Sequence, residues 1–242
     1  MRFSSLSKSI TRRGILMVSG LLAGSLLLSS CLDNLESPEL PPAAYVTIFQ
    51  GSTTAPAMDI FANQNRVNQT PLEYTQVLPY SAYFPGRRDF RFSAFNSASA
   101  LLEKNFELKA DSVYSVFVAD ATQGIDAILV KDIWEDPTEA KAQLRFVHLS
   151  RDTESVYLEA SGSTTALGTG STFKSVSGFE ELPKGNVTLT VKSTKTDETL
   201  IQTGTLELKG NRVYTLVMRG LNSESTGDKK LDLQLVTNYI KY

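Results

Sequence analysis

The chain has 242 residues, with 24 Lys plus Arg, 26 Asp plus Glu and a single cysteine, and its formal net charge is −2. Residues 1–30 hold four cationic residues and no acidic ones, so the remaining 212 residues carry 20 cations against 26 anions, a net charge of −6. Such an acidic chain repels phosphate backbones and anionic lipid head groups, which argues against nucleic acid as a partner and against an electrostatic membrane attachment. A lone cysteine also excludes an internal disulfide framework.

Residues 1–30 have the pattern of an export signal. A basic segment that ends in Arg12 and Arg13 precedes an uncharged stretch over residues 14–30, which is short and rich in Gly and Ser for a membrane-spanning helix. We therefore expect a cleaved signal peptide. The arginine pair resembles the twin-arginine export motif, but adjacent basic residues occur in any such segment, and export of an unfolded chain is the favoured expectation.

The signal ends in Leu28-Ser29-Ser30-Cys31, which resembles the bacterial lipobox. The resemblance implies that the Cys31 thiolate takes a diacylglyceryl group, that signal peptidase II cleaves between Ser30 and Cys31, and that the new amine is acylated. Two or three acyl chains hold a protein firmly on a membrane, where one chain holds only marginally. The alternative is a buried or reactive free thiol in an uncleaved leader. Residues 31–43 are then the lipidated cysteine and an acidic, proline-bearing tether.

The rest of the chain repeats itself. Residues 106–118 match residues 206–218 at an offset of 100, and residues 46–50 match residues 144–148 at an offset of 98. Matches in the same order with nearly constant spacing indicate two homologous domains. We place these domains at residues 44–133 and 142–242, with a linker over residues 134–141.

Both repeats show alternation of apolar and polar residues rather than helical periodicity. Phe90 and Phe92, for example, alternate with Arg91 and Ser93. Period two over many short segments, broken by Gly, Pro, Asn and Ser, predicts an all-β fold: two tandem immunoglobulin-like β-sandwich domains after the signal peptide, with about seven strands each. Only residues 134–142 could hold a helical turn.

These residues resemble the family called domain of unknown function 4397. Repeat one keeps the later half of the family motif in residues 55–61, with Gln50 where a histidine is expected, and repeat two keeps the earlier half in residues 147–152. Each repeat also has a turn before a Val-Tyr strand, VYSVFV or VYTLVM. The resemblance covers residues 44–238 and implies an exported protein with no established activity.

The search for catalytic and metal sites finds little. His148, Ser150 and Asp152 lie at alternate positions, but neighbours on one strand face are roughly 6.5 Å apart, too far for proton transfer, and no nucleophile elbow accompanies them. In repeat one, Gln50 holds the position that corresponds to His148 in repeat two. A polar residue at this position in both repeats suggests a role in hydrogen bonding at the end of a strand. One histidine and no free cysteine exclude zinc and copper sites, and no calcium loop or phosphate-binding loop is present, so we expect no cofactor and no metal.

Two features are candidates for ligand binding. Tyr80 and Tyr83, near Arg87 and Arg88, form an aromatic and basic segment suited to stacking on sugars or to receiving an acidic peptide. The alternative, which we favour, is that the aromatic residues of this segment are core or rim residues of a strand pair. Trp134, the only tryptophan, lies in the linker. It either presents an aromatic ring to a ligand or covers the seam between the domains, which we favour.

These observations predict a lipid-anchored protein of a bacterial cell envelope, in the outer membrane rather than the inner one and facing the periplasm or the surface. We expect a non-catalytic binding or structural module whose partners are the membrane, through the lipid, and a glycan or protein of the envelope. An alternative is a glycan-binding or adhesion accessory protein of a nutrient-uptake or attachment system. A third is an enzyme with an unrecognised site around His148.

Overall fold

The structure is a computed structural model that describes residues 41–163 and 166–242. In these ranges the chain forms strands, turns and irregular segments and no helix, and residues 42–242 make one compact unit. The predicted all-β fold is confirmed. The signal peptide, the cleavage site at Ser30 and Cys31, and the tether up to residue 40 lie outside the described residues, and the predictions for them stay predictions.

The first lobe contains the strands up to residue 131. It is built of β1 (Ala44–Gln50), β2 (Met58–Ala62), β3 (Asn65–Arg66), β4 (Val77–Tyr83), β5 (Gly86–Ala94), β6 (Ala100–Leu108), β7 (Ser112–Asp120) and β8 (Ile125–Lys131). These strands form two sheets, in the orders β4-β1-β7-β8 and β3-β2-β5-β6. All neighbours are antiparallel except β1 and β7, which are parallel.

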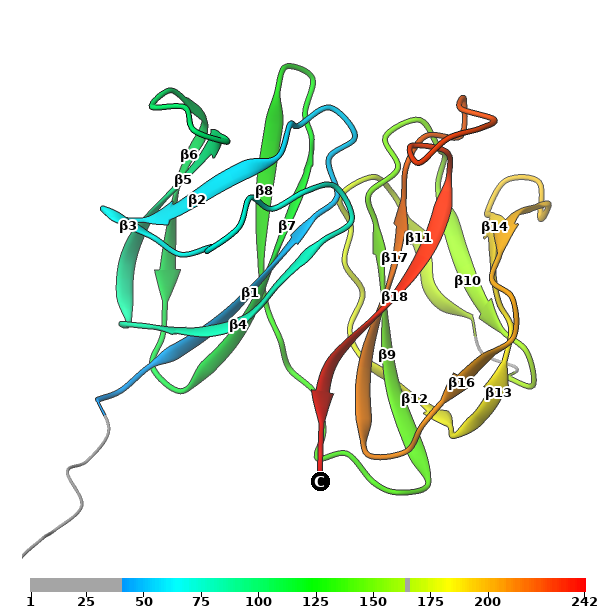
Figure 1. The fold of residues 1–242 in the computed structure, drawn as a ribbon. Helices are drawn as coiled ribbons and strands as arrows, with labels where there is room; N and C mark the ends of the chain where they lie inside the picture. Colours follow the sequence, from blue (N-terminus) through cyan, green and yellow to red (C-terminus); the bar gives the residue numbers. More distant parts are fainter. Residues whose placement is uncertain (1–40, 164–165) are drawn as a thin grey trace, which may run out of the picture. The chain divides into compact units, whose positions relative to one another are not determined.

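The second lobe repeats this arrangement (Figure 1). It is built of β9 (Lys141–His148), β10 (Val156–Ala160), β11 (Leu167–Ser171), β12 (Glu180–Pro183), β13 (Gly185–Val187), β14 (Leu189–Ser193), β15 (Thr199–Gln202), β16 (Leu206–Leu208), β17 (Arg212–Arg219) and β18 (Asp232–Ile240). Its sheets have the orders β12-β9-β17-β18, β11-β10-β14-β15 and β13-β16, and β9 and β17 are again parallel. The pair β13 and β16 corresponds to the start of β5 and the end of β6, which pair in the same way in the first lobe.

Each lobe has an apolar core between its sheets. Alternate residues of β1 and β7 point into the first core, among them Val46, Ile48 and Val116, which are fully buried. The corresponding strands β9 and β17 supply Leu144 and Leu216 to the second core. Burial of one face of each sheet explains the alternation that predicts the strands.

The Val-Tyr motif of both repeats has a structural role. The Tyr114 hydroxyl accepts a hydrogen bond from the Lys109 backbone N–H at 3.1 Å, and Tyr214 accepts one from Lys209 at 3.2 Å. The turn between donor and acceptor contains a residue with positive φ, Asp111 in the first lobe and its Asn counterpart in the second. This is the tyrosine corner found in immunoglobulin-like sandwiches, and it closes the turn before β7 and β17.

Two expectations about local structure need correction. The lobes have eight and ten strands instead of about seven each, because β3 is a two-residue strand and the β13–β16 region is divided into short pieces. Residues 134–142 contain no helical turn: residues 134–138 are irregular, and a turn at residues 139–140 leads into β9 at Lys141. Pro137 is buried there, and proline favours extended backbone in the residue before it.

The lobes have their strands aligned. Arg145, in the middle of β9, contacts Ser115 in the middle of β7, and Arg151, after β9, contacts Asp120 at the end of β7. We call the end of the lobes where β1 and β9 begin the proximal end. The opposite end, with the loops after β1, β7, β9 and β17, is the distal end (Figure 1).

Candidate functional site

The two lobes pack through equivalent faces of their β1-β7 and β9-β17 sheets. The residues of β1 and β7 that point away from the first core face the second lobe, and the same holds in reverse for β9 and β17. They form a third apolar core of Phe49, Phe117, Ala119, Val147, Leu149 and Val217. Both faces of these sheets are therefore buried, and the lobes make one body with a continuous apolar interior.

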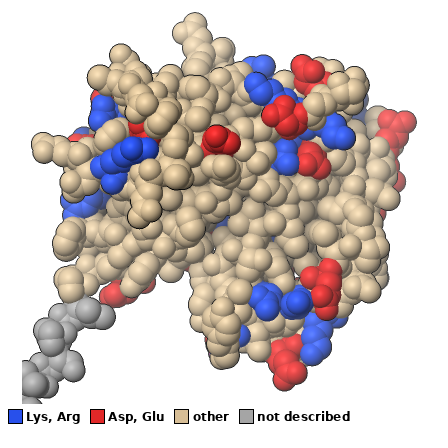
Figure 2. All heavy atoms as spheres, viewed as in Figure 1, with Lys and Arg blue, Asp and Glu red and all other residues tan. Residues whose placement is uncertain are grey.

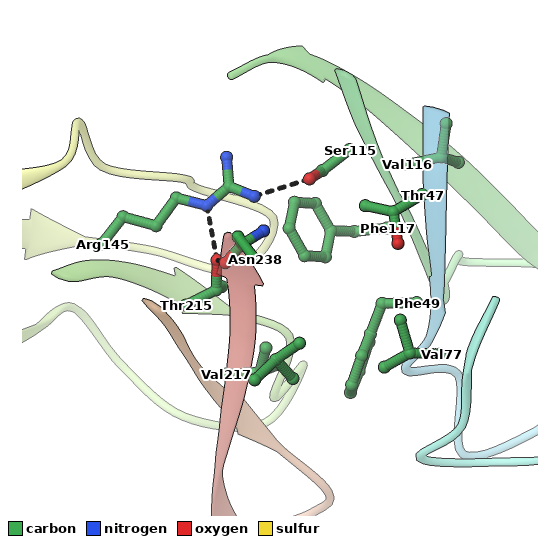
Figure 3. Close-up of a pocket in the computed structure, with 11 residues that line it drawn as sticks. Thr47, Phe49, Val77, Ser115, Val116, Phe117, Arg145, Thr215, Val217 and Asn238 are labelled. Atoms are coloured by element: carbon green, nitrogen blue, oxygen red, sulfur yellow. Dashed lines mark hydrogen bonds between the residues drawn. The ribbon is translucent and has the colours of Figure 1, made fainter. Parts of the chain in front are cut away.

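A buried ion pair between Arg145 and Asp132 lies in this interface, and Figure 3 shows Arg145 with its hydrogen-bond partners Ser115 and Thr215. Arg145 and Asp132 have side-chain exposures of 1% and 0%, and the Arg145 Nη1 donates to Asp132 Oδ1 at 2.5 Å. The other guanidinium nitrogens donate to Ser115 at 2.6 Å and to Thr215 at 2.8 Å. The guanidinium also lies 4.5 Å from the centre of the Phe179 ring. Because every nitrogen has a partner, the desolvated cation is compensated in full.

Asp132 is satisfied from the other side by residues of the first lobe. The Tyr80 hydroxyl donates to Asp132 Oδ2 at 2.6 Å, and Ser115 donates to the same oxygen at 2.7 Å. Asn238, in β18, donates to the Tyr80 hydroxyl at 2.9 Å, and burial raises the pKa of Tyr80 above its ordinary value. The cavity beside this network measures about 10 Å³, space for about one water molecule. The interface is thus a connection between lobes and not a ligand pocket.

The distal end of the first lobe is organised by the Asp120 carboxylate. It accepts hydrogen bonds from the hydroxyls of Ser52 at 2.5 Å, Thr53 at 2.6 Å and Thr54 at 2.9 Å, and from the Thr54 backbone N–H at 3.2 Å. Burial raises the pKa of Asp120, but these donors outweigh it and hold the pKa below its ordinary value. The carboxylate therefore stays charged and fixes the loop after β1.

A groove of about 280 Å³ lies next to this loop. Loops after β1 and β7 and the start of β6 line it, and Arg151 from the second lobe completes it; the apolar part of its wall includes Ala55, Pro56, Leu101 and Ile125. The Arg151 Nε is 3.6 Å from Asp120 Oδ2, and its side chain is 43% exposed. Within the described residues this guanidinium donates no hydrogen bond, so a carboxylate of a ligand could pair with it.

His148 lies at the buried end of β9. Its Nε2 is 3.0 Å from the Thr153 hydroxyl, whereas Ser150 donates to Asp152 at 3.2 Å, so the three residues weighed as a catalytic trio are not linked in series. Burial lowers the pKa of His148 to about 4, which keeps the ring neutral. Asp152 holds the loop after β17 by accepting from the backbone N–H groups of Asn222 and Ser223, each at 2.8 Å.

The five residues proposed for ligand binding are not brought together. Tyr80 belongs to the lobe interface, and Tyr83 is buried in the first core against Phe90, where burial raises its pKa to about 12. Arg87 is exposed on β5 beside an acidic neighbour. Arg88 donates to the carbonyls of Phe84 and Pro85 and fixes their turn. The residues of this segment thus belong to the first core, to the lobe interface and to a turn.

Trp134 lies at the proximal side of the interface. Its ring stacks on Tyr239 of β18 at a centroid distance of 5.7 Å and meets the edge of Phe179 at the same distance. Both partners belong to the second lobe, so these contacts tie the linker to that lobe, and the role of Trp134 in covering the seam between the domains stays a prediction.

The described residues contain no group of three or more His, Cys, Asp or Glu side chains placed to hold a metal ion. In the same ranges no helix is long and apolar enough to cross a membrane.

The fold defines a tandem β-sandwich protein whose lobes are fixed by a buried ion pair and which carries a groove between distal loops. Residues 44–159 match the family described as domain of unknown function (DUF4397). The resemblance predicted from the motifs is confirmed there, and the match ends just inside the second lobe.

Two of the solved structures with similarity to the chain come from Bacteroides ovatus ATCC 8483. A DUF3823 family protein is 10% identical, with 69% of this chain and 99% of that chain covered and a TM-score of 0.21. Another protein, described provisionally as a cell adhesion protein, is 11% identical, with 84% of this chain and 99% of that chain covered and a TM-score of 0.25. No curated protein matches the chain.

Sequence reasoning missed Arg145, Asp132 and Arg151. Arg145 occurs in the segment LRFVH, where an arginine among apolar residues is the signal of a cation inside a sheet that is buried on both faces. Arg151 gives no such signal, because its groove is assembled from loops that are far apart in sequence.

Proposed function

We propose that this protein is a lipid-anchored protein of the bacterial envelope that acts as a rigid, non-catalytic binding or structural module. The observation that carries the proposal is the position of Cys31 in a lipobox-like motif, 13 residues before β1 begins at Ala44. An anchor at Cys31 would enter the folded unit at its proximal end. The loops and groove of the distal end would then point away from the membrane.

The rigidity of the folded unit supports a role in presenting a surface. The buried pair of Arg145 and Asp132, the shared apolar core and the Asp120–Arg151 contact all join the lobes. Asp126 adds another link, since it is 2.8 Å from both Lys104 of the first lobe and Lys174 of the second. A module with this many connections holds its distal loops in one orientation, which favours recognition by reducing the entropy lost on binding.

The distal groove is the best candidate for the bound partner. Its Arg151 guanidinium, which lies 3.6 Å from Asp120 but donates no hydrogen bond within the described residues, and its short apolar wall suit a protein or peptide segment that carries a carboxylate next to an apolar side chain. The distal groove offers a glycan no stacking platform, because no aromatic side chain lines it. The distal groove therefore favours a protein partner over a sugar.

Two measurements test the proposal. Labelled palmitate should enter the wild-type chain in its host and should not enter a Cys31→Ser variant, which should leave the membrane fraction. An unmodified peptide spanning residues 28–31 in the membrane-bound protein would refute the anchor. For binding, a pull-down from the host envelope should lose its specific partner with Arg151→Ala and keep it with Arg87→Ala, a control arginine at the proximal end. Equal capture by both variants would remove the groove from the proposal.

A further inference from the structure

The exposed large apolar side chains gather at one end of the molecule. Of the seven in the described residues, two, Phe95 and Leu101, lie at the distal end. The other five form what we call the proximal rim, with these exposures: Tyr45 47%, Phe84 69%, Ile133 70%, Tyr239 42% and Tyr242 107%. Single exposed apolar residues are common on soluble proteins, but a group at one end indicates a contact surface.

The strand register places the five at the same end. Tyr45 is the second residue of β1, and Phe84 follows Tyr83, which pairs with the first residue of β1. Ile133 comes two residues after β8, whose last residue pairs near the start of β7. Tyr239 pairs near the start of β17, and Tyr242 follows it beyond β18.

Local contacts fix parts of the rim in the exposed position. The Arg88 guanidinium donates to the carbonyls of Phe84 and Pro85 at 2.8 and 2.7 Å, and holds the turn that carries the Phe84 ring. Tyr239 is backed by Trp134, which is itself packed on Phe179. The apolar groups are thus presented by ordered structure and do not have to rearrange before they make contact.

Five cations around the rim are paired with acidic neighbours. Lys141 contacts Glu181, Lys184 contacts Glu139, Lys209 contacts Glu207, Lys241 contacts Asp136 and Arg87 contacts Asp89. Figure 2 likewise shows basic and acidic side chains interspersed on the face it presents, with uncharged surface between them. Attraction to an anionic surface is therefore weak, and whatever binds the rim binds it through apolar contact.

We infer that the proximal rim rests on the lipid surface to which Cys31 is anchored, with its aromatic rings in the interfacial layer. The inference rests on the proposed lipid anchor. Twelve residues separate Cys31 from Ala44, and even a fully extended chain of that length spans only about 40 Å. An anchor so near the rim keeps its effective concentration at the membrane high, so a small interfacial affinity suffices. Tyr and Trp favour this layer, since their rings are apolar and their polar edges reach water, and Phe84 and Ile133 add purely apolar contact.

Trp134 provides the probe, because it is the only tryptophan and lies beside the rim. The mature chain from Cys31, which contains the whole compact unit, is coupled through its only thiol to a maleimide lipid in phosphatidylcholine vesicles. Trp134 emission should fall when the vesicle lipids are brominated, and the loss should not depend on salt. A Trp134→Phe, Gln123→Trp variant, which moves the probe to the distal hairpin, should show no loss.

The variants separate the rim from the rest of the surface. Phe84→Ser with Ile133→Ser should reduce the loss of emission, whereas Phe95→Ser with Leu101→Ser, the same change at the distal end, should leave it unaltered. Equal loss from both probe positions, or no loss from Trp134, would overturn the inference. Because the lipid is attached chemically, failure of Cys31 to be acylated in the host would refute the proposed anchor without touching this result.

Discussion

The buried ion pair at the lobe interface gives the sharpest prediction. Arg145→Met keeps most of the apolar stem and removes the guanidinium, so Asp132 remains fully buried with only Tyr80 and Ser115 as donors. Removing one partner of a buried pair costs about 3–5 kcal/mol, because the remaining charge is uncompensated. That is a large fraction of the roughly 5–15 kcal/mol that stabilises a domain. We expect the free energy of unfolding to fall by an amount in this range.

The double variant Arg145→Met, Asp132→Asn should recover part of the loss. The asparagine carries no charge and its carbonyl can still accept from Tyr80 or Ser115, so the two changes should be non-additive by about 0.5–3 kcal/mol. Arg87→Met, the same substitution at an ion pair whose side chains are 69% exposed, serves as control and should cost no more than about 1 kcal/mol.

Urea unfolding followed by circular dichroism and by Trp134 emission measures all of these variants. Trp134 belongs to the linker and packs on the second lobe, so the unfolding transition seen in its emission reports on the interface. In the wild type this transition should coincide with the loss of the circular dichroism signal of the strands. The reasoning is refuted if Arg145→Met costs as little as Arg87→Met, or if the double variant is as unstable as the sum of its singles.

Other substitutions probe the distal end and the turns. Burial lowers the pKa of His148 in the folded state from 6.5 to about 4. The contribution of His148 to the free energy of unfolding is therefore complete above pH 6.5 and declines by roughly 3 kcal/mol as the pH falls toward 4. His148→Gln should remove this pH dependence of the free energy of unfolding, measured by urea unfolding between pH 6.5 and 4. Asp120→Ala strands three hydroxyl donors and should lower the unfolding free energy by about 1–3 kcal/mol. Gly210→Ala would push a Cβ into the Glu139 carbonyl and should cost about 1–3 kcal/mol, whereas Gly204→Ala has no neighbour within 4 Å and should have little effect on the melting temperature.

The strand architecture could be predicted because the repeat preserves its local chemistry. The turn, the positive-φ residue and the tyrosine recur at an offset of 100, so the same corner closes twice. The assignment of Tyr83 to a ligand site was harder to judge from sequence, since adjacent residues on a strand point to opposite sides. Tyr83 is buried and Phe84 is 69% exposed, although both belong to one aromatic pair.

The buried interface between the lobes could have been inferred from strands in which apolar residues do not alternate with polar ones. Segments such as VTIF and RFVH are apolar at both parities, which is typical of strands buried on both faces. Which polar residues meet across such an interface depends on how two distant strands align, and one sequence does not contain that information. The distal groove could not be predicted from the sequence for the same reason, because residues 54–56, 121–125 and Arg151 come together only in the folded chain.

The two interface faces are equivalent in the repeat but differ in charge. Thr47 corresponds to Arg145, Ser115 to Thr215 and Asp132 to Asn238, so Ser115 donates to Asp132 in one lobe while Thr215 donates to Asn238 in the other.

This difference determines which faces can pair. A first-lobe face packed on another first-lobe face would bury two Asp132 carboxylates with no cation, and two second-lobe faces would bury two Arg145 guanidinium groups with no anion. The heterologous pairing within one chain joins one of each and leaves no unpaired charge. The difference at two equivalent positions therefore favours the packing of a first lobe on a second lobe over the packing of two identical lobes.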